Sequence, residues 1–256
     1  MTIAQALALG MLQGFTEFLP VSSSGHLVIL QGLFGLKEPQ VAFDIFLHLG
    51  TTVSVFIFFS KFILRLFGED KRLLFFIALA SIPTFIIGFL FKGAVEVLFG
   101  MPGIVGVMLA LTGIWLILAT FLPRYLTKSG TKRCPGFTSS LLIGIAQGIA
   151  VVPGISRSGM TIGAGMLTGL DKEMAFKFSM VLSIPAVLGA SVLKAHSIGS
   201  ILVSHEAFIF LTGGIAAMLV GLFAIRVLLG FVRTNRLYVF GVYCILVGCI
   251  VALFYR

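Results

Sequence analysis

Three ionisable side chains stand out because they lie in short polar stretches of an otherwise apolar sequence. Glu17 and His26 belong to the first stretch, and Arg157 belongs to the second. A charge at the depth of a bilayer is costly, so a carboxylate, an imidazole and a guanidinium in this setting predict a functional site. A guanidinium binds phosphate oxygens in pairs and keeps its charge in a poor dielectric. The set therefore indicates an anionic ligand.

The first stretch has the pattern of a helix that ends, turns and begins again. Gln13 and Glu17 are four residues apart and share one helix face. Pro20 ends that helix, and the serines after it can cap a second helix whose N-terminus is a seat for phosphate. The residues predicted here are Gln13, Ser22, Ser24 and Gly25 for substrate binding and Glu17, Ser23 and His26 for catalysis. The alternative is that the serines only cap a helix.

The second stretch repeats this arrangement with an arginine at its tip. Its hydroxyl groups can donate to a phosphate, and its glycines let the backbone approach a ligand. Around the catalytic candidate Arg157, the residues predicted to bind substrate are Gly154, Ser156, Ser158, Gly159 and Thr161. A purely structural salt bridge between Arg157 and Glu17 is the alternative, and the two roles are compatible.

The two stretches are copies of each other at a constant offset of 134 residues. Gln13-Gly14 recurs as Gln147-Gly148, and the Ser-x-Ser-Gly of residues 22–25 recurs at residues 156–159. Each copy, 3–36 and 137–169, contains two apolar runs that are too short to cross a bilayer. Such runs favour half-helices that enter the membrane and return.

The remaining sequence predicts an integral membrane protein. Of its 256 residues, 59% are hydrophobic and only 11% are charged. Several apolar runs reach about twenty residues, enough to cross roughly 30 Å of hydrocarbon. The six spans predicted are 41–60, 73–92, 102–122, 173–194, 206–225 and 238–255. The expected fold class is therefore all-α, with six transmembrane helices and two re-entrant helical hairpins.

The basic residues predict how these elements cross the membrane. If both hairpins are re-entrant, 13 of the 18 Lys and Arg residues fall in loops on one side, four fall on the other, and Arg157 lies in the second turn. The positive-inside rule then places the larger set in the cytoplasm and both termini outside, so the net charge of +9 does not indicate nucleic acid. Each half has an odd number of crossings. Repeat 1 (1–122) and repeat 2 (137–256) are thus inverted, joined by a cytoplasmic loop (123–136) in one membrane domain.

Other polar residues are less informative. Asp44 and His48 are expected to be interfacial or packing residues more than pocket residues, and His196 and His205 to lie in an outer loop. The three cysteines have neither metal-ligand spacing nor a disulfide framework. The first residues lack the basic region of a cleaved signal peptide. No Walker loop or HExxH motif is present, which leaves nucleotide-driven motors and metalloproteases without support.

At these residues the chain resembles the bacterial undecaprenyl-diphosphate phosphatases, also known as bacitracin-resistance proteins. The family's signatures are an acid or Gln, three residues and Glu, leading to a Pro-x-Ser-Ser-x-Gly-His turn, and a Pro-Gly-x-Ser-Arg-Ser-x-x-Thr turn. They appear at residues 13–26 and 153–161, and the likeness covers essentially the whole chain. The resemblance implies hydrolysis of undecaprenyl diphosphate to undecaprenyl phosphate and inorganic phosphate, which recycles the lipid carrier for peptidoglycan synthesis.

The resemblance also implies a setting for this reaction. The protein is expected in the bacterial plasma membrane, with a polyprenyl diphosphate lipid as substrate and a pocket that opens to the periplasmic face. Divalent cations, Mg or Ca, support activity in the family, but many members carry Glu where Gln13 stands here. A neutral amide is a weaker metal ligand, so Glu17 and the diphosphate itself would supply most ligands. A homodimer is left open.

Three candidate nucleophiles and two classes of function stay open at this stage. The terminal phosphorus can be attacked by Ser23 or by water, with Glu17 and His26 handling protons, and His26 itself is a further candidate nucleophile. Broken helices of inverted repeats that meet at mid-membrane are also typical of secondary transporters. A polyprenyl-phosphate flippase or an anion transporter is therefore the alternative to a phosphatase. A non-catalytic scaffold does not explain two polar turns at bilayer depth.

Overall fold

The computed structural model describes residues 1–36, 40–122, 132–193 and 206–255. Within these ranges the regular elements are helices, apart from one isolated bridge between Lys132 and Leu170. Four described helices are long and apolar enough to cross a membrane: α5 (Lys71–Leu90), α7 (Pro102–Phe121), α11 (Lys172–Leu193) and α13 (Ala207–Arg233). A bent pair, α3 and α4, is a fifth candidate. The chain is therefore an all-α, multi-pass membrane protein, as the sequence predicts.

The predicted boundaries change most at the first span, 41–60. Here α3 (Val41–Phe58) is followed by α4 (Ser60–Phe67), and the two are bent by 77°. Phe62 and Leu66 on α4 are buried while Lys61 and Arg65 are exposed, so this segment is an amphipathic helix and not the predicted loop. A short helix, α6 (Lys92–Phe99), follows α5. The last helix, α14 (Tyr238–Phe254), has only 17 residues.

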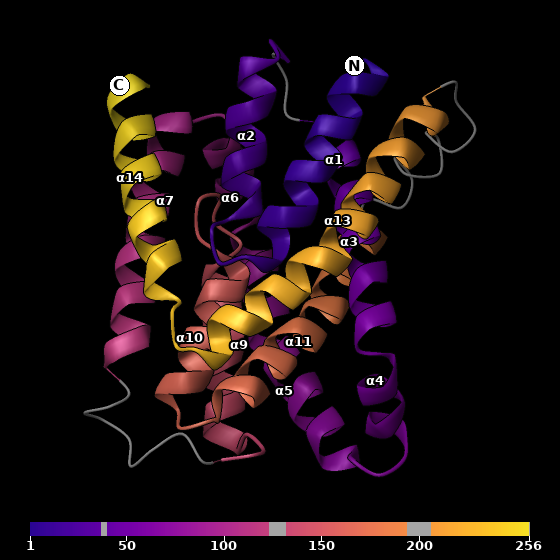
Figure 1. Ribbon diagram of the computed structural model, residues 1–256, viewed down its shortest axis with the longest axis vertical. Helices are drawn as coiled ribbons and strands as arrows, with labels where there is room; N and C mark the ends of the chain where they lie inside the picture. The colour runs from indigo at the N-terminus through magenta and orange to yellow at the C-terminus, as the bar shows by residue number, and fades with distance from the viewer. Residues whose placement is uncertain (37–39, 123–131, 194–205, 256) are drawn as a thin grey trace.

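Two pairs of shorter helices occupy the segments predicted as hairpins. The first pair is α1 (Ile3–Phe18) and α2 (Ser23–Leu33), and the second is α9 (Phe137–Ile149) and α10 (Arg157–Leu167). In Figure 1, α1 and α2 lie in the half of the molecule that holds both termini, whereas α9 and α10 lie in the opposite half. The two turns, one from each pair, are therefore directed toward the middle of the molecule.

Each hairpin packs against a helix from the other half of the sequence. The helix α1 packs on α13, and α9 packs on α5. A Cβ atom at Gly10 would lie 2.3 Å from the carbonyl oxygen of Gly213, and one at Gly144 would lie 2.1 Å from that of Ala80. Only glycine allows backbones to approach this closely, as in other helix pairs inside membranes. The two equivalent glycines thus seat the two hairpins in equivalent ways.

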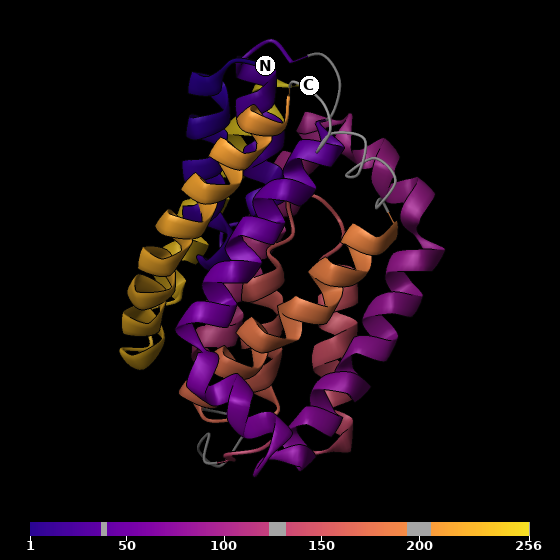
Figure 2. The same ribbon diagram turned by 90° about the vertical axis from the view of Figure 1, so that its right-hand side faces the viewer.

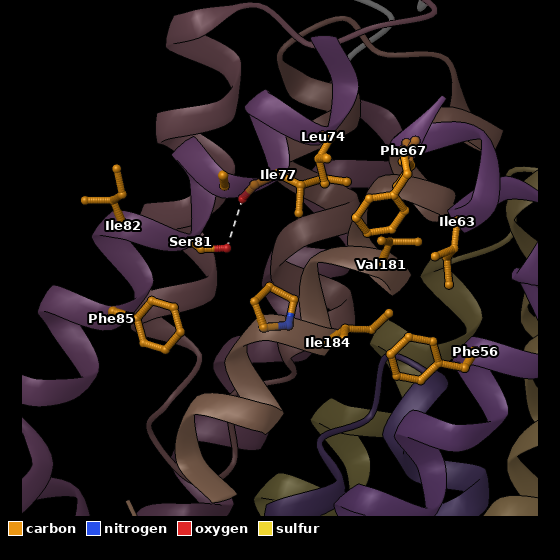
Figure 3. A pocket seen from close by; sticks show the side chains of 13 residues that line it. Phe56, Ile63, Phe67, Leu74, Ile77, Ser81, Ile82, Phe85, Val181 and Ile184 are labelled. Carbon is orange, nitrogen blue, oxygen red and sulfur yellow. Dashed lines mark hydrogen bonds between the residues drawn. The ribbon is translucent and has the colours of Figure 1, made fainter. Parts of the chain in front are cut away.

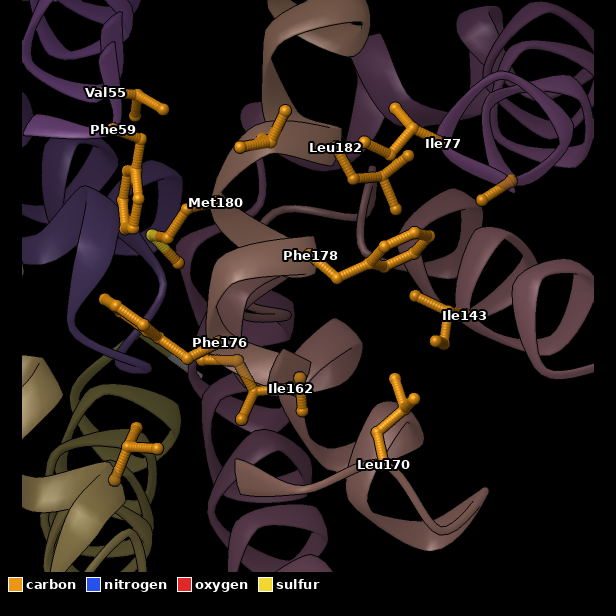
Figure 4. Close-up of a cluster of buried hydrophobic side chains, with 14 of the residues drawn as sticks. Val55, Phe59, Ile77, Ile143, Ile162, Leu170, Phe176, Phe178, Met180 and Leu182 are labelled. Carbon is orange, nitrogen blue, oxygen red and sulfur yellow. The ribbon is translucent and has the colours of Figure 1, made fainter. Parts of the chain in front are cut away.

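The hydrophobic core is built around α11. Figure 2 shows this helix crossing diagonally between α3 and α5. Four of its side chains, Phe176, Phe178, Met180 and Leu182, have no exposed surface and point to different sides of the helix (Figure 4). Burial on several sides places this part of α11 in the interior, whereas Leu188 and Val192 farther along the helix are exposed. Ser179, a polar residue in the same part of α11, is also fully buried and is held by this packing.

An apolar cavity of about 520 Å³ lies beside α11. Its walls come from α3, α4, α5 and α11, and include Phe56, Phe67, Phe85 and Ile184 (Figure 3). The hydroxyl group of Ser81 also lines it but donates to the carbonyl oxygen of Ile77 in its own helix, at 2.9 Å. The lining therefore offers a surface for hydrocarbon and few groups for a polar ligand.

Candidate active site

Glu17 is the centre of the site, and side chains from both hairpins bind its carboxylate. Oxygen Oε1 accepts a hydrogen bond from Nη2 of Arg157 at 2.5 Å. Oxygen Oε2 accepts one from the Ser23 hydroxyl at 2.7 Å and one from Nε2 of Gln13 at 3.0 Å. The side chain of Glu17 is only 6% exposed, so the carboxylate is held almost entirely by these partners. The structure thus brings together the residues at the two predicted turns.

The two turns also contact each other directly. The Ser158 hydroxyl donates to the carbonyl oxygen of Leu19 at 3.4 Å. A Cβ atom at Gly25 would lie 3.3 Å from the Cα atom of Gly154, a tight contact that shows how closely the two turns approach each other. The second turn therefore lies against the first, and the helix N-termini of α2 and α10 face a shared space.

The same serine cap begins the returning helix in both hairpins. Ser22 caps α2 by accepting from the amide of Gly25 at 3.4 Å, and Ser156 caps α10 by accepting from the amide of Gly159 at 3.1 Å. Caps of this kind satisfy one of the free amides of the first turn. The residue after the cap is Ser23 in the first hairpin and Arg157 in the second. Each is the first residue of its helix, and each bonds Glu17. Two helix N-termini with partial positive charge thus flank one carboxylate.

The backbones of the two turns differ in length, residues 19–22 in the first and 150–156 in the second, and in the place of the positive φ. Ser22 has a positive φ of 65°, a left-handed conformation that costs a residue with a Cβ atom about 1–2 kcal/mol. In the second turn the positive φ, 95°, falls on Gly154, where it carries no such cost. Strain of this size at a non-glycine residue is typical of functional sites. The first turn is therefore the more constrained of the two.

Two other helices hold the second turn in place. On α7, the Thr112 hydroxyl donates to the carbonyl oxygen of Gly154 at 3.0 Å and accepts from the amide of Ser156 at 3.1 Å. On α11, the carbonyl oxygen of Ser179 accepts from Nη1 of Arg157 at 3.4 Å. The Ser179 hydroxyl also bonds Thr161, at 2.5 Å. Neither Thr112 nor Ser179 was predicted from the sequence, since nothing in an isolated Thr or Ser of a span distinguishes it.

His26 is engaged away from the carboxylate. Its Nδ1 lies 2.8 Å from the carbonyl oxygen of Ser22, and its Nε2 lies 2.8 Å from the hydroxyl of Tyr243. The two rings are stacked, with centroids 5.7 Å apart. Because both nitrogens have partners, His26 fixes the first turn and α14 relative to each other. It is not among the groups that contact Glu17 in the described structure.

His48 joins the site, contrary to the expectation that it is mainly a packing residue. Its Nδ1 lies 3.1 Å from Glu17 Oε2 and 2.9 Å from Nε2 of Gln13. Asp44, one turn earlier on α3, accepts a hydrogen bond from Gln31 at 2.7 Å. An acid and a histidine four residues apart on an apolar helix share one face, and that spacing is the signal that could have predicted a polar role. His196 and His205 lie outside the described residues.

The remaining predicted residues line the turns as caps and spacers. The Ser24 hydroxyl lies 3.3 Å from that of Ser22, and the Ser158 hydroxyl lies 3.3 Å from that of Ser156. The amide carbonyl of Gln13, Oε1, is buried without a hydrogen-bond partner. Their predicted role in substrate binding stays a prediction.

The geometry defines the chemistry that the site can perform. A serine hydroxyl bonded to a carboxylate is a nucleophile beside its base. Arginine carries five N–H donors, and those not used by Glu17 and Ser179 can bind phosphate oxygens. The charges of Glu17 and Arg157 offset each other, which leaves the positive ends of two helices to attract an anion. The arrangement suits attack on phosphorus more than binding of a neutral ligand.

The donor atoms do not fit a resident divalent cation. Ca²⁺ requires six to eight oxygen ligands, and Mg²⁺ is held by one or two carboxylates together with substrate phosphates. Here one carboxylate, Glu17, is already bonded through both oxygens, and a guanidinium lies beside it. The described residues contain no group of three or more His, Cys, Asp or Glu side chains arranged to hold a metal. We therefore derive no step through a protein-bound ion.

The fold and this site together define a class: helical membrane proteins with a buried anion site where two hairpins meet. Comparison with known proteins narrows the class further. The sequence matches the family described as bacitracin resistance protein BacA over residues 6–250, and the chain belongs to that family.

Several relatives are similar to this chain over nearly their full length. A protein named undecaprenyl-diphosphatase from Carboxydothermus hydrogenoformans is 43% identical, over 95% of this chain and 94% of its own. Proteins with the same name from Desulforapulum autotrophicum and Methanobrevibacter smithii are 42% and 40% identical, each over 98% of this chain and 97% of its own. The family resemblance found in the two motifs is thus confirmed across the whole sequence.

Proposed function

We propose that this protein hydrolyses undecaprenyl diphosphate to undecaprenyl phosphate and inorganic phosphate, and so returns the lipid carrier to cell-wall synthesis. Its family and the names of its relatives support this activity. The observation that carries it is the Ser23 hydroxyl, which donates to the buried Glu17 carboxylate beside Arg157. A bound diphosphate in this position has a nucleophile, a base and a cation within reach.

In this proposal the second turn binds the diphosphate. The free N–H groups of Arg157 and the hydroxyls of Ser156 and Ser158 hold the phosphate oxygens, and the N-termini of α2 and α10 add partial positive charge. Thr161 acts one step back, because its hydroxyl is bonded to the Arg157 carbonyl oxygen at 2.8 Å and to Ser179. Charge that develops on the phosphoryl oxygens is then stabilised by groups that are already oriented.

The first turn performs the transfer. Ser23 Oγ forms a bond to the terminal phosphorus, the bridging P–O bond breaks, and its electron pair leaves with undecaprenyl phosphate. Glu17 Oε2 accepts the serine proton. Water then attacks the phosphoserine, the bond between Ser23 Oγ and phosphorus breaks, and a proton from water restores the Ser23 hydroxyl. Inorganic phosphate leaves, and the proton held by Glu17 is released to solvent. Ser23 is preferred over His26 as nucleophile because both nitrogens of His26 are already bonded elsewhere.

We further infer the predicted topology: six spans, two re-entrant hairpins and inverted repeats in a plasma membrane, with the site open to the periplasmic face. Three observations support it. The hairpins lie in opposite halves of the molecule (Figure 1), each packs on a helix from the other repeat, and α7 packs on α14, its counterpart. Cysteine scanning of loops 68–70 and 234–237 with an impermeant thiol reagent tests the orientation. Labelling of these loops in intact cells would contradict it.

The prenyl tail is proposed to lie between the spans, and the apolar cavity beside α11 is a candidate place for part of it. Ser81→Phe places a large ring in that cavity and removes only a bond within its own helix. We expect a KM for the long-chain substrate raised about tenfold, with a short-chain prenyl diphosphate unaffected. Ser191→Phe is a matched control, because Ser191 also bonds its own helix, at Val187. Equal effects on both substrates would contradict the tail site.

The deciding experiment is phosphate release from undecaprenyl diphosphate by purified protein in detergent, with and without a chelator. Hydrolysis in detergent, where no gradient exists, is expected from a phosphatase. The transporter alternative rests on the same convergence of broken helices and predicts lipid movement in liposomes without hydrolysis. Absence of phosphate release in both chelated and cation-supplemented samples would reject the phosphatase.

A further inference from the structure

His48 reaches the site from outside both hairpins. It lies on α3, 35 residues after Gln13, yet its Nδ1 is within 3.1 Å of the carboxylate oxygen that also accepts from Ser23. Oxygen Oε1 of Glu17 is bonded by Arg157, so the two oxygens serve different partners. Nδ1 of His48 therefore lies beside Glu17 Oε2, the oxygen proposed to receive the proton of Ser23.

The ring is held in this position by the packing of its helix. A Cβ atom at Gly50 would lie 2.2 Å from the carbonyl oxygen of Gly214, so α3 lies tightly against α13 at this level. The hydroxyls of Thr51 and Thr52 both donate to the carbonyl oxygen of His48, at 2.9 and 2.8 Å. The backbone that carries the ring is therefore held closely against α13.

Two hydrogen-bond arrangements fit the same distances. The amide nitrogen of Gln13 carries two hydrogens, so it can donate both to Glu17 and to an unprotonated Nδ1 of His48. When Nδ1 is protonated, the imidazole donates directly to Glu17 Oε2, and Gln13 keeps its own bond to that oxygen. Protonation of His48 therefore exchanges the bond from Gln13 for one to Glu17, and the second N–H group of Gln13 must turn away from the ring.

The internal repeat gives an independent reason to couple His48 with Glu17. At the offset of 134 residues, Gln13 corresponds to Gln147, Glu17 to Val151 and His48 to Leu182. Gln147 donates to the carbonyl oxygen of Leu182 at 3.4 Å, so position 182 has the same place beside its glutamine. The half that has the acid has the imidazole, and the half that lacks one lacks both.

We propose that His48 is a positioning residue that takes the place of a second acid at the site. It orients Glu17 through Oε2 and receives the proton that Glu17 takes from the nucleophile. A second carboxylate in the place of the Gln13 amide could hold that proton, but this chain has an amide there and an imidazole 2.9 Å from it. The inference rests on the phosphatase function proposed above.

The proton balance of the reaction is compatible with this role. During attack, the Ser23 proton passes to Glu17 Oε2 and on to His48 Nδ1, which leaves the carboxylate charged and paired with Arg157. Hydrolysis of the phosphoserine returns a proton from water to Ser23. The proton on His48 then leaves through the exposed part of the ring. The side chain of His48 is 28% exposed, against 17% for Arg157 and 6% for Glu17.

Three charged groups surround the imidazole: Glu17 from α1, Asp44 from its own helix and Arg157 from α10. Because these groups differ in sign, substitution of His48 should alter how the rate depends on pH, and not only its maximum.

The test measures kcat and KM in detergent across about pH 5–8, the range in which an imidazole titrates. For His48→Gln we expect a kcat lowered about 10- to 100-fold with little change in KM, and loss of the acid limb of the profile. Gln13→Glu alone should also lower kcat, since a second carboxylate keeps the ring protonated. In Gln13→Glu/His48→Gln, two carboxylates share one proton, and kcat should recover at least tenfold over His48→Gln.

Each result decides the matter. A His48→Gln enzyme with the wild-type profile, or a double variant without recovery, overturns the inference. A loss of rate with an unchanged acid limb assigns His48 a structural role only and overturns it as well. If His48→Gln does not fold, judged by its melting temperature in detergent, His48→Asn and the double variant give the same comparison. Failure of the wild-type protein to release phosphate would instead reject the proposed function itself.

Discussion

The two hairpins share a backbone arrangement but supply side chains of opposite charge to the site. Both end their first half-helix near the middle of the molecule, cap the second with a serine, and pack on a helix of the other repeat through a glycine, Gly10 or Gly144. The first hairpin supplies the acid and the hydroxyl, and the second supplies the guanidinium. A charge pair split between two copies forms only when both copies are in place. Duplication thus gives a site in which binding and transfer are assigned to different halves.

Few substitutions separate the hairpin that supplies the acid and the hydroxyl from the hairpin that supplies the guanidinium. In the alignment of the two repeats, Glu17 corresponds to Val151, and Ser23 corresponds to Arg157. The equivalent residues Ser23 and Arg157 both contact the one carboxylate, from opposite hairpins. The difference indicates that the backbone of the turn sets where a side chain goes, and that the side chain alone sets what it does.

Replacement of the nucleophile is expected to give the largest effect. Ser23→Ala should lower kcat about 10³-fold or more, because the hydroxyl on Glu17 is removed while binding through the second hairpin is kept. Phosphate release under saturating substrate measures this. Ser191→Ala is the control, since the Ser191 hydroxyl bonds its own helix at Val187 and has no predicted role in the site, and it should stay within about threefold of wild type. Equal losses for the two variants would remove the assignment of Ser23.

Removal of the second hairpin's charge should have a slightly smaller effect. Arg157→Ala is expected to lower kcat/KM by about 10²- to 10³-fold, because a donor to the transition state is lost. It also leaves Glu17 buried without its cation, a defect worth about 3–5 kcal/mol of stability. Arg157→Lys restores the charge but not the paired donors, and should recover only part of the rate. Near-normal turnover in Arg157→Ala would show that the two hairpins do not share one site.

The same substitution at the equivalent residues Gln13 and Gln147 tests whether only the first hairpin tolerates an added carboxylate. Gln147→Glu loses the donor to the Thr84 hydroxyl and the Leu182 carbonyl oxygen, and places a carboxylate against that carbonyl. We expect a loss of about 3 kcal/mol in stability. Gln13→Glu should cost less, about 1 kcal/mol, because His48 lies 2.9 Å away and can pair with the new carboxylate. Thermal unfolding in detergent gives both values, and a larger cost at position 13 would contradict the comparison.

The sequence predicts the two hairpins and the fold class, but little of how the surrounding helices pack against the hairpins. The offset of 134 residues and the polar turns predict both hairpins, with α2 and α10 beginning after Ser22 and Ser156 as the caps require. The long apolar runs predict the class of the fold. Local patterns could not predict the 77° bend after α3, because the charges on α4 resemble those of a loop. They also could not place His48, whose partners lie on another helix.

The residues that brace the second turn were missed for a related reason. Thr112 and Trp115 on α7 bond the backbone at Gly154 and Gly159, and a hydroxyl or an indole within an apolar span has no sequence signature for such contacts. Which helix lies beside a turn is decided by packing over the whole chain. Seats such as Gly10 and Gly144 became interpretable only once their partners, Gly213 and Ala80, were known.

The smallest expected effect concerns the place of the positive φ in the two turns. Ser22→Gly loses a cap but relieves the positive φ, whereas Ser156→Gly loses the same kind of cap with no strain to relieve. Ser22→Gly should therefore be the more stable of the two variants by about 1–2 kcal/mol, the cost of the left-handed conformation. Melting temperatures of the two variants in one detergent measure the difference directly. If strain at Ser22 also orients Ser23 toward Glu17, Ser22→Gly will lose rate while it keeps stability, which Ser156→Gly will not do. Equal melting temperatures and equal rates would mean that the two turns are interchangeable in their backbones, and that only their side chains distinguish them.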